Sequence, residues 1–382
     1  MVMLRSPETG AGVMRWRVLG QGEEEAGWRD WLRACEHEEL LDDRDGNASG
    51  LEAPLLDGTP EAVVVGGALE SRNEPIRRGA ELGVALIVLH PAGLDPDALY
   101  QVAVLPRDQA PALVPELPWL TDPGWVLVRE RVERGEVGET VSIQFQAELG
   151  RRRPEVSAAA YAGGVGSALV PLLGSVEAVT ATGTDEPIER RIVQLRGSNG
   201  GDAELRITRG LAATTEARLE VVGERGSVVW VGDAWLTSPA TVRIQRGQQT
   251  EVIEIGEVDR RAALLASLKA QCQGQEGRPG LREAILAMEI GEAVERSRAR
   301  GRTFELHQDE ISELGSFKAV MTSLGCGVIL MVLTLFVLAQ IMRALEIPGS
   351  AIVAWSTLPL LAGYALLQLL RWAARPSRGR GD

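Results

Sequence analysis

The chain has 382 residues, a formal net charge of −13 and 45% hydrophobic residues. This length leaves room for two domains, and the apolar share is normal for a globular protein. The negative charge argues against nucleic acid as a partner. Its three cysteines, Cys35, Cys272 and Cys326, lie far apart and show neither a zinc spacing nor a disulfide framework. We therefore expect reduced thiols and no metal site.

The N-terminal part contains a glycine pair of the kind found in phosphate-binding turns. A strand is expected over Met14–Leu19, and Gly20 and Gly22 follow it. Glycines at such a turn let the pyrophosphate of a dinucleotide approach the N-terminus of the next helix. Three glutamates, residues 23–25, come next, and their charge would repel a phosphate. Two interpretations stay open: a weak dinucleotide-binding loop, or a plain turn into a helix over residues 28–35.

The clearest pattern in the chain is a strand–helix–strand unit. Ala62–Val65 is a short apolar, β-branched run, as expected of a strand buried on both faces, and Gly66 and Gly67 end it. A helix with one apolar face is expected over residues 73–82, and a second apolar strand over residues 85–89. Such a unit of about 30 residues predicts a parallel sheet.

Beyond this unit the pattern changes to a strand-rich segment. Residues 140–256 contain about eight short runs of alternating polarity, separated by turns, which predict an open, mostly antiparallel sheet. Because residues 161–173 are rich in glycine, we expect an irregular helix there. The other expected helices cover residues 97–104, 125–135, 262–272 and 280–300.

The unit over residues 62–96 resembles the Gfo/Idh/MocA family of oxidoreductases. In that family a strand, a helix and a strand lead to a Leu-Asp-Pro sequence, which stands here at residues 94–96. The resemblance extends over roughly residues 14–306. It implies an α/β fold with a shortened Rossmann-like domain over residues 1–121 and an α+β domain with an open sheet over residues 122–306.

The resemblance implies binding of NAD or NADP, but the reactive positions of the family are altered. The family's lysine beside the nicotinamide falls on His90, and its Asp-x-Gly-x-His-x-x-Asp signature falls on residues 160–167, where the histidine and both aspartates are absent. We therefore expect a degenerate member, with NAD or NADP or with no cofactor, that binds a ligand or acts as a scaffold. The family also implies a homo-oligomer formed through the open sheet face.

The alternative is an active NAD(P)-dependent dehydrogenase of a sugar or polyol. His90 would then act as general acid and base, because the pKa of histidine lies near neutrality; otherwise it is a strand-end histidine without chemistry. The cofactor would lie against four glycines: Gly20, Gly22, Gly66 and Gly67.

The C-terminal part predicts a two-helix membrane hairpin. After a polar linker over residues 307–318, two apolar runs cover residues 319–342 and 351–371, and a bilayer-spanning helix needs about 20 residues. The tail over residues 372–382 is basic, and positive charge favours the cytoplasmic side. We expect a protein of the cell inner membrane, with two spans, a lipid bilayer as partner and its N-terminal domain in the cytoplasm. The alternative is a buried globular hairpin.

Overall fold

The computed structural model describes residues 13–41, 60–106, 109–210, 215–275 and 277–306. All of them belong to one compact unit, Met1–Gln308. The predicted spans at residues 319–342 and 351–371, with their linker and tail, lie outside the described residues. Among the residues that are described, no helix is long and apolar enough to cross a bilayer.

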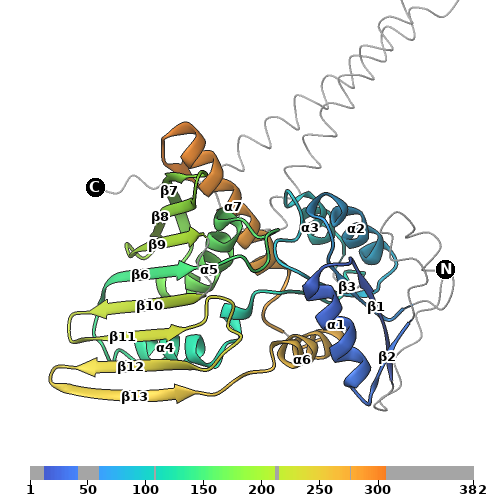
Figure 1. Cartoon of the computed structure of the whole chain (residues 1–382), viewed down its shortest axis with the longest axis horizontal. Helices are drawn as coiled ribbons and strands as arrows, with labels where there is room; N and C mark the ends of the chain where they lie inside the picture. The colour runs from blue at the N-terminus through green and yellow to red at the C-terminus, as the bar shows by residue number, and fades with distance from the viewer. Residues whose placement is uncertain (1–12, 42–59, 107–108, 211–214, 276, 307–382) are drawn as a thin grey trace, which may run out of the picture. The chain divides into compact units, whose positions relative to one another are not determined.

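The first sheet has five parallel strands in the order β2-β1-β3-β4-β5 (Figure 1). The chain leaves β1 toward β2 and then returns to the other side of β1, so a topological switch point lies between β1 and β3. The predicted Rossmann-like sheet is thus confirmed. Its strands are β1 Met14–Leu19, β2 Glu38–Leu40, β3 Ala62–Val65, β4 Ala85–Val88 and β5 Leu113–Pro115.

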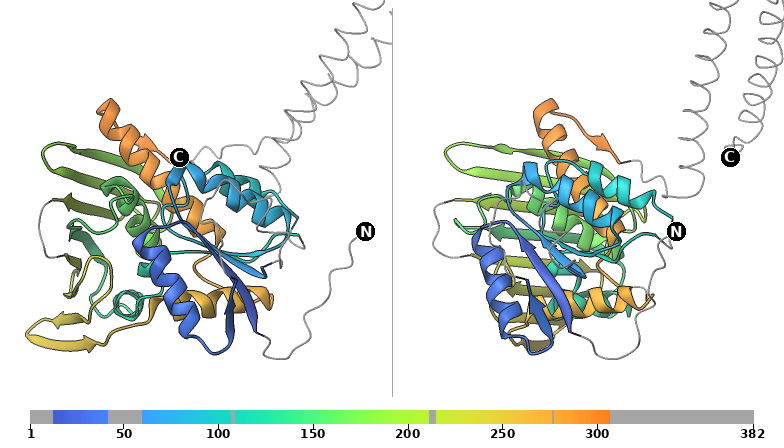
Figure 2. Two further views of the ribbon diagram at one scale, coloured as in Figure 1. Left: turned by 45° about the vertical axis from the view of Figure 1, so that its right-hand side comes forward. Right: turned by 90° about the vertical axis from the view of Figure 1, so that its right-hand side faces the viewer.

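Helices cover both faces of this sheet. Helices α1 (Glu23–Ala34) and α6 (Arg260–Cys272) pack on one face through a cluster that includes Trp28 and Leu264. The opposite face is covered by α2 (Asn73–Glu81), α3 (Asp97–Ala103) and the first half of α7 (Leu281–Arg300) (Figure 2). Helices α6 and α7 come from the predicted second domain, so residues of that domain complete the helical cover of the first sheet.

The second sheet has nine strands in the order β13-β12-β11-β10-β6-β9-β8-β7-β14. Only the pairing of β6 with β9 is parallel, so the predicted, mostly antiparallel sheet is confirmed. Helices α4 (Pro123–Glu133) and α5 (Ala158–Leu173) pack on one face with the end of α7. The strands are β6 Thr140–Glu148, β7 Val176–Thr184, β8 Glu189–Gly197, β9 Asp202–Arg209, β10 Glu216–Gly223, β11 Gly226–Gly232, β12 Ala240–Arg246, β13 Gln249–Ile255 and β14 Phe304–Glu305.

Helix α5 corrects the prediction of an irregular helix. It is continuous over 16 residues and almost fully buried. Its glycines serve tight packing: a Cβ on Gly163 would collide with the carbonyl of Ala287 on α7, and a Cβ on Gly291 of α7 would lie 3.3 Å from the carbonyl oxygen of Ala159. The two backbones can approach because neither glycine has a side chain, and the packing outweighs the low helix propensity of glycine.

Candidate functional site

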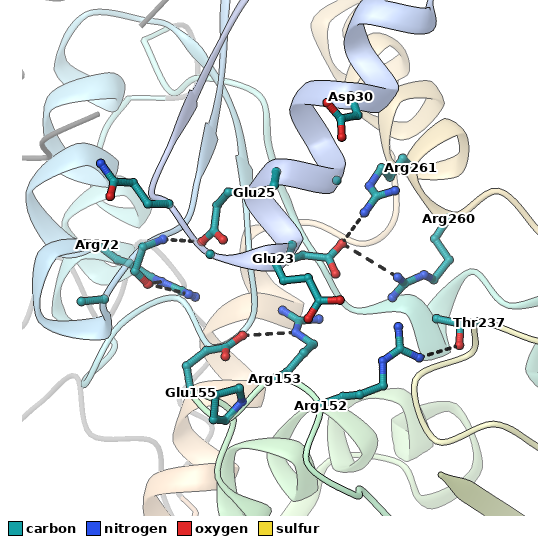
Figure 3. Close-up of a pocket in the computed structure, with 18 of the residues that line it drawn as sticks. Glu23, Glu25, Asp30, Arg72, Arg152, Arg153, Glu155, Thr237, Arg260 and Arg261 are labelled. Carbon is teal, nitrogen blue, oxygen red and sulfur yellow. Dashed lines mark hydrogen bonds and ion pairs between the residues drawn. The ribbon is translucent and has the colours of Figure 1, made fainter. Parts of the chain in front are cut away.

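A cavity of about 1040 Å³ opens where β1, β3 and the loop after β6 meet. In doubly wound α/β folds, ligands bind beyond the carboxyl ends of the strands at the switch point, so this cavity is the candidate site. Its wall is strongly charged (Figure 3). The acids are Glu23, Glu24, Glu25, Asp30, Glu155 and Glu257, and the arginines are Arg72, Arg152, Arg153, Arg260 and Arg261.

The Glu25 carboxylate fills the space that the predicted glycines create. Gly67 N–H donates to Glu25 Oε1 at 2.5 Å, and the Glu25 residue is only 4% exposed. A Cβ on Gly22 or Gly66 would collide with this carboxylate, and one on Gly20 would lie 2.9 Å from Glu25 Oε1. The structure thus brings the four predicted glycines together. The space that they leave, called the glycine cradle below, holds the Glu25 carboxylate.

Arg72 stands beside this carboxylate as a buried cation. It is 1% exposed, and its Nε and Nη2 donate to the Gly67 carbonyl at 3.0 and 2.9 Å. Its Nη1 donates to the carbonyls of Leu89 at 2.9 Å and Pro91 at 2.5 Å, so it ties together the ends of β3 and β4. Burial lowers the pKa of Arg72, and the charge of Glu25 opposes that shift.

His90 lies in the interior and is not part of the cavity wall. It is 6% exposed, and its Nε2 lies 2.8 Å from the carbonyl oxygen of Ala160. Since a carbonyl only accepts, Nε2 carries the proton. Burial lowers the pKa of His90 to about 4, so the ring is neutral at pH 7. A Cβ on Gly164 would lie 3.3 Å from Nε2, and the ring of Trp119 stands edge-on nearby.

Two positions of the family signature lie beside His90, as the resemblance implies, but the residues at these positions cannot carry the family's chemistry. Ala160 and Gly164, which occupy the first aspartate and the histidine positions of the family signature, both lie against His90. Neither supplies an ionisable side chain. The space beside them is occupied by the rings of Trp119 and Tyr161, whose centroids are 5.0 Å apart.

An ion pair that the sequence did not predict separates His90 from the cavity. Arg153 Nη2 lies 2.7 Å from Glu116 Oε2 and also donates to the His90 carbonyl at 3.2 Å. Burial would raise the pKa of Glu116, but Arg153 and the nearby Arg260 outweigh it and hold that pKa below its usual value. The run of three arginines at residues 151–153 was the only signal in the sequence.

Comparison with known proteins identifies the fold. No protein-family model matches the chain, and no curated protein matches it. Many solved structures are similar. Among them are an oxidoreductase from Agrobacterium radiobacter in complex with NAD+, L-tartaric acid and magnesium, the WlbA dehydrogenase from Bordetella pertussis in complex with NADH and UDP-GlcNAcA, and biliverdin reductase from Synechocystis in complex with biliverdin and NADP+.

The likeness is one of fold. The three structures are 14%, 16% and 18% identical to this chain, with TM-scores of 0.63, 0.62 and 0.60. The alignments cover 76%, 78% and 75% of this chain and 98%, 100% and 99% of the others. All three structures contain a nicotinamide dinucleotide: NAD+, NADH and NADP+. The described part of the chain therefore has the fold of NAD(P)-dependent oxidoreductases.

Proposed function

We propose that this chain is a catalytically degenerate protein of oxidoreductase fold, which binds a ligand or acts as a scaffold at the membrane. Hydride transfer by an enzyme of this fold needs a bound nicotinamide and a group that moves a proton at the substrate. The observation that carries the proposal is the Glu25 carboxylate on Gly67 N–H, inside the glycine cradle.

Glu25 opposes dinucleotide binding in two ways. A pyrophosphate at the N-terminus of α1 would meet the space that the Glu25 carboxylate fills, and it would also meet the charges of Glu23 and Glu24 on the same turn. Expelling Glu25 means breaking a hydrogen bond to a charged group, which contributes about 1.5–3 kcal/mol.

The surroundings of His90 support the absence of an acid–base pair. A general base must reach the substrate proton directly or through one water molecule. His90 is buried, engaged with the Ala160 carbonyl and screened by the pair of Arg153 and Glu116. The alternative is an active NAD(P)-dependent sugar or polyol dehydrogenase with His90 as acid and base. That activity would require His90 to leave the Ala160 carbonyl and the Arg153–Glu116 pair to separate.

The sequence patterns support a membrane location and self-association. The apolar runs over residues 319–342 and 351–371 and the basic tail favour two spans in the cell inner membrane, with the N-terminal domain in the cytoplasm and the bilayer as partner. The open face of the nine-stranded sheet is the surface that we propose for a homo-oligomer. Protease protection of residues 1–306 in inverted vesicles would contradict the topology.

Calorimetric titration of the full-length protein with NADH and NADPH tests the proposal. We expect no detectable heat of binding up to about 1 mM of either dinucleotide, the level of a weak encounter. A dissociation constant near about 1 μM for either one would contradict the proposal and favour the dehydrogenase.

A further inference from the structure

We propose that the charged cavity binds a small hydroxylated anion, whose carboxylate or phosphate group lies between Arg152 and Arg260. The inference rests on the proposed function, because it gives a ligand class to a cavity whose phosphate cradle holds Glu25. It follows from the partners of the five arginines in the wall: three are held by backbone carbonyls or close carboxylates, whereas Arg152 donates to one hydroxyl and Arg260 has only distant ion pairs.

The engaged arginines are Arg72, Arg153 and Arg261. Arg72 donates to backbone carbonyls, Arg153 pairs with Glu116 at 2.7 Å, and Arg261 Nη2 lies 3.0 Å from Glu24 Oε1. Arg261 also stacks on the ring of Trp28, with its guanidinium carbon 5.7 Å from the ring centroid. These three side chains already have close partners within the protein, and a ligand would have to compete with those partners for them.

Arg260 is a cation without a hydrogen bond among the residues that the structure describes. Its nearest carboxylate oxygens are those of Glu116 at 3.8 Å and Glu24 at 3.9 Å, beyond hydrogen-bond reach. The side chain is 17% exposed and faces the cavity. It also occupies the first position of α6, where the helix dipole disfavours positive charge. An anion at this place would satisfy the guanidinium and offset the dipole.

Arg152 supplies the second half of the site from the loop after β6. Its Nη1 donates to Thr237 Oγ1 at 3.0 Å, and no carboxylate among the described residues lies within ion-pair distance of it. Figure 3 shows the guanidinium groups of Arg152 and Arg260 directed toward one another. Two facing cations repel, and an oxyanion between them would accept hydrogen bonds from both guanidinium groups.

The remaining wall indicates what the rest of the ligand carries. Glu23, Asp30 and Glu257 line the same cavity, and ionised carboxylates only accept hydrogen bonds. Hydroxyl groups are the neutral donors that suit them. The volume of about 1040 Å³ is large enough for an organic molecule rather than an inorganic ion. The ligand class is therefore a polyhydroxylated acid or phosphate ester.

Calorimetry on the full-length protein with three probes tests the inference. D-gluconate carries the carboxylate, D-glucose 6-phosphate carries the phosphate, and D-glucose carries neither. We expect at least one of the two anions to bind with a dissociation constant of about 1 mM or tighter, and glucose to bind at least about tenfold more weakly. Binding of neither anion, or equal binding of glucose, would overturn the inference.

Single arginine variants test where in the cavity the anion binds. Arg152→Gln and Arg260→Gln should each weaken binding of the anion about tenfold, because each variant loses a hydrogen bond to a charged group. Arg151→Gln is the matched control, because Arg151 is exposed and is not part of the cavity wall. An affinity unchanged in both variants would overturn the inference and leave the proposed function intact, whereas micromolar NADH binding would overturn the proposed function alone.

Discussion

At the scale of single residues, Glu25 is held by charge as well as by shape. Its carboxylate accepts from Gly67 N–H at 2.5 Å and lies near the buried guanidinium of Arg72. Glu25→Gln keeps the shape and removes the charge. We expect the free energy of unfolding in urea to fall by about 1–2 kcal/mol, the difference between a charged and a neutral hydrogen bond.

Glu23 provides the control for this measurement. It stands on the same helical turn but is exposed, so Glu23→Gln should change the free energy of unfolding by no more than about 0.5 kcal/mol. Equal stabilities of the two variants would mean that the Glu25 carboxylate is not held in the cradle.

The burial of His90 predicts that the stability of the folded state depends on pH. Its pKa is about 4 in the folded protein because of burial, against 6.5 for the ordinary side chain. The unfolded chain therefore binds more protons between these values, and the folded state loses stability as the pH falls from 6.5 toward 4. We expect a loss of about 2 kcal/mol between pH 7 and pH 5.

Denaturation of two histidine variants at both pH values checks this assignment. His90→Gln can still donate to the Ala160 carbonyl but does not titrate, so that part of the pH dependence should vanish. His37→Gln should keep the wild-type dependence, since His37 is exposed. The same slope in all three proteins would show that His90 is not buried in neutral form.

At the scale of elements, the contact between α5 and α7 depends on the absence of a side chain at Gly163. Gly163→Ala would press a methyl group against the Ala287 carbonyl, and overpacking of this kind destabilises by about 1–3 kcal/mol. We expect a clear drop in the thermal midpoint. Gly256→Ala is the control, because a Cβ there has no neighbour within 4 Å. A midpoint unchanged by Gly163→Ala would contradict the close packing of these helices.

The same elements show what the sequence can and cannot predict. The strands Met14–Leu19 and Ala62–Val65 are predicted at their observed bounds, because a short run rich in apolar residues that is followed by glycine is a local signal. Helix α1 begins at Glu23, five residues before its predicted start, since its acidic first turn suits the helix N-terminus. Helix α5 is regular because of α7, a partner that local propensity does not contain.

The candidate site also has features that the sequence shows and contacts that only the fold creates. The glycines and the acidic turn are visible in the sequence, and so is the substitution of the family's lysine by His90. The pairing of Arg153 with Glu116, and the facing of Arg152 with Arg260, join segments far apart in the chain. The run of arginines at residues 151–153 marks one side of these contacts, but the sequence does not show their partners, because the packing of the two sheets brings them together.

At the scale of the whole molecule, we propose that the C-terminal apolar runs over residues 319–342 and 351–371 anchor the folded part to a membrane. If residues 319–371 form two spans, the full chain should remain with the membrane pellet after carbonate extraction. A chain ending at residue 308 should move to the supernatant, because it lacks both predicted spans. Recovery of the full chain in the supernatant would contradict the proposed anchor.

The central claim is that the chain's own carboxylate occupies the place of the cofactor's phosphates. A crystal structure of the protein grown with millimolar NADH tests it most directly. The account predicts that Glu25 still accepts from Gly67 N–H and that no dinucleotide lies at the N-terminus of α1. A pyrophosphate on that helix, with Glu25 displaced and the nicotinamide ring beside His90, would contradict it.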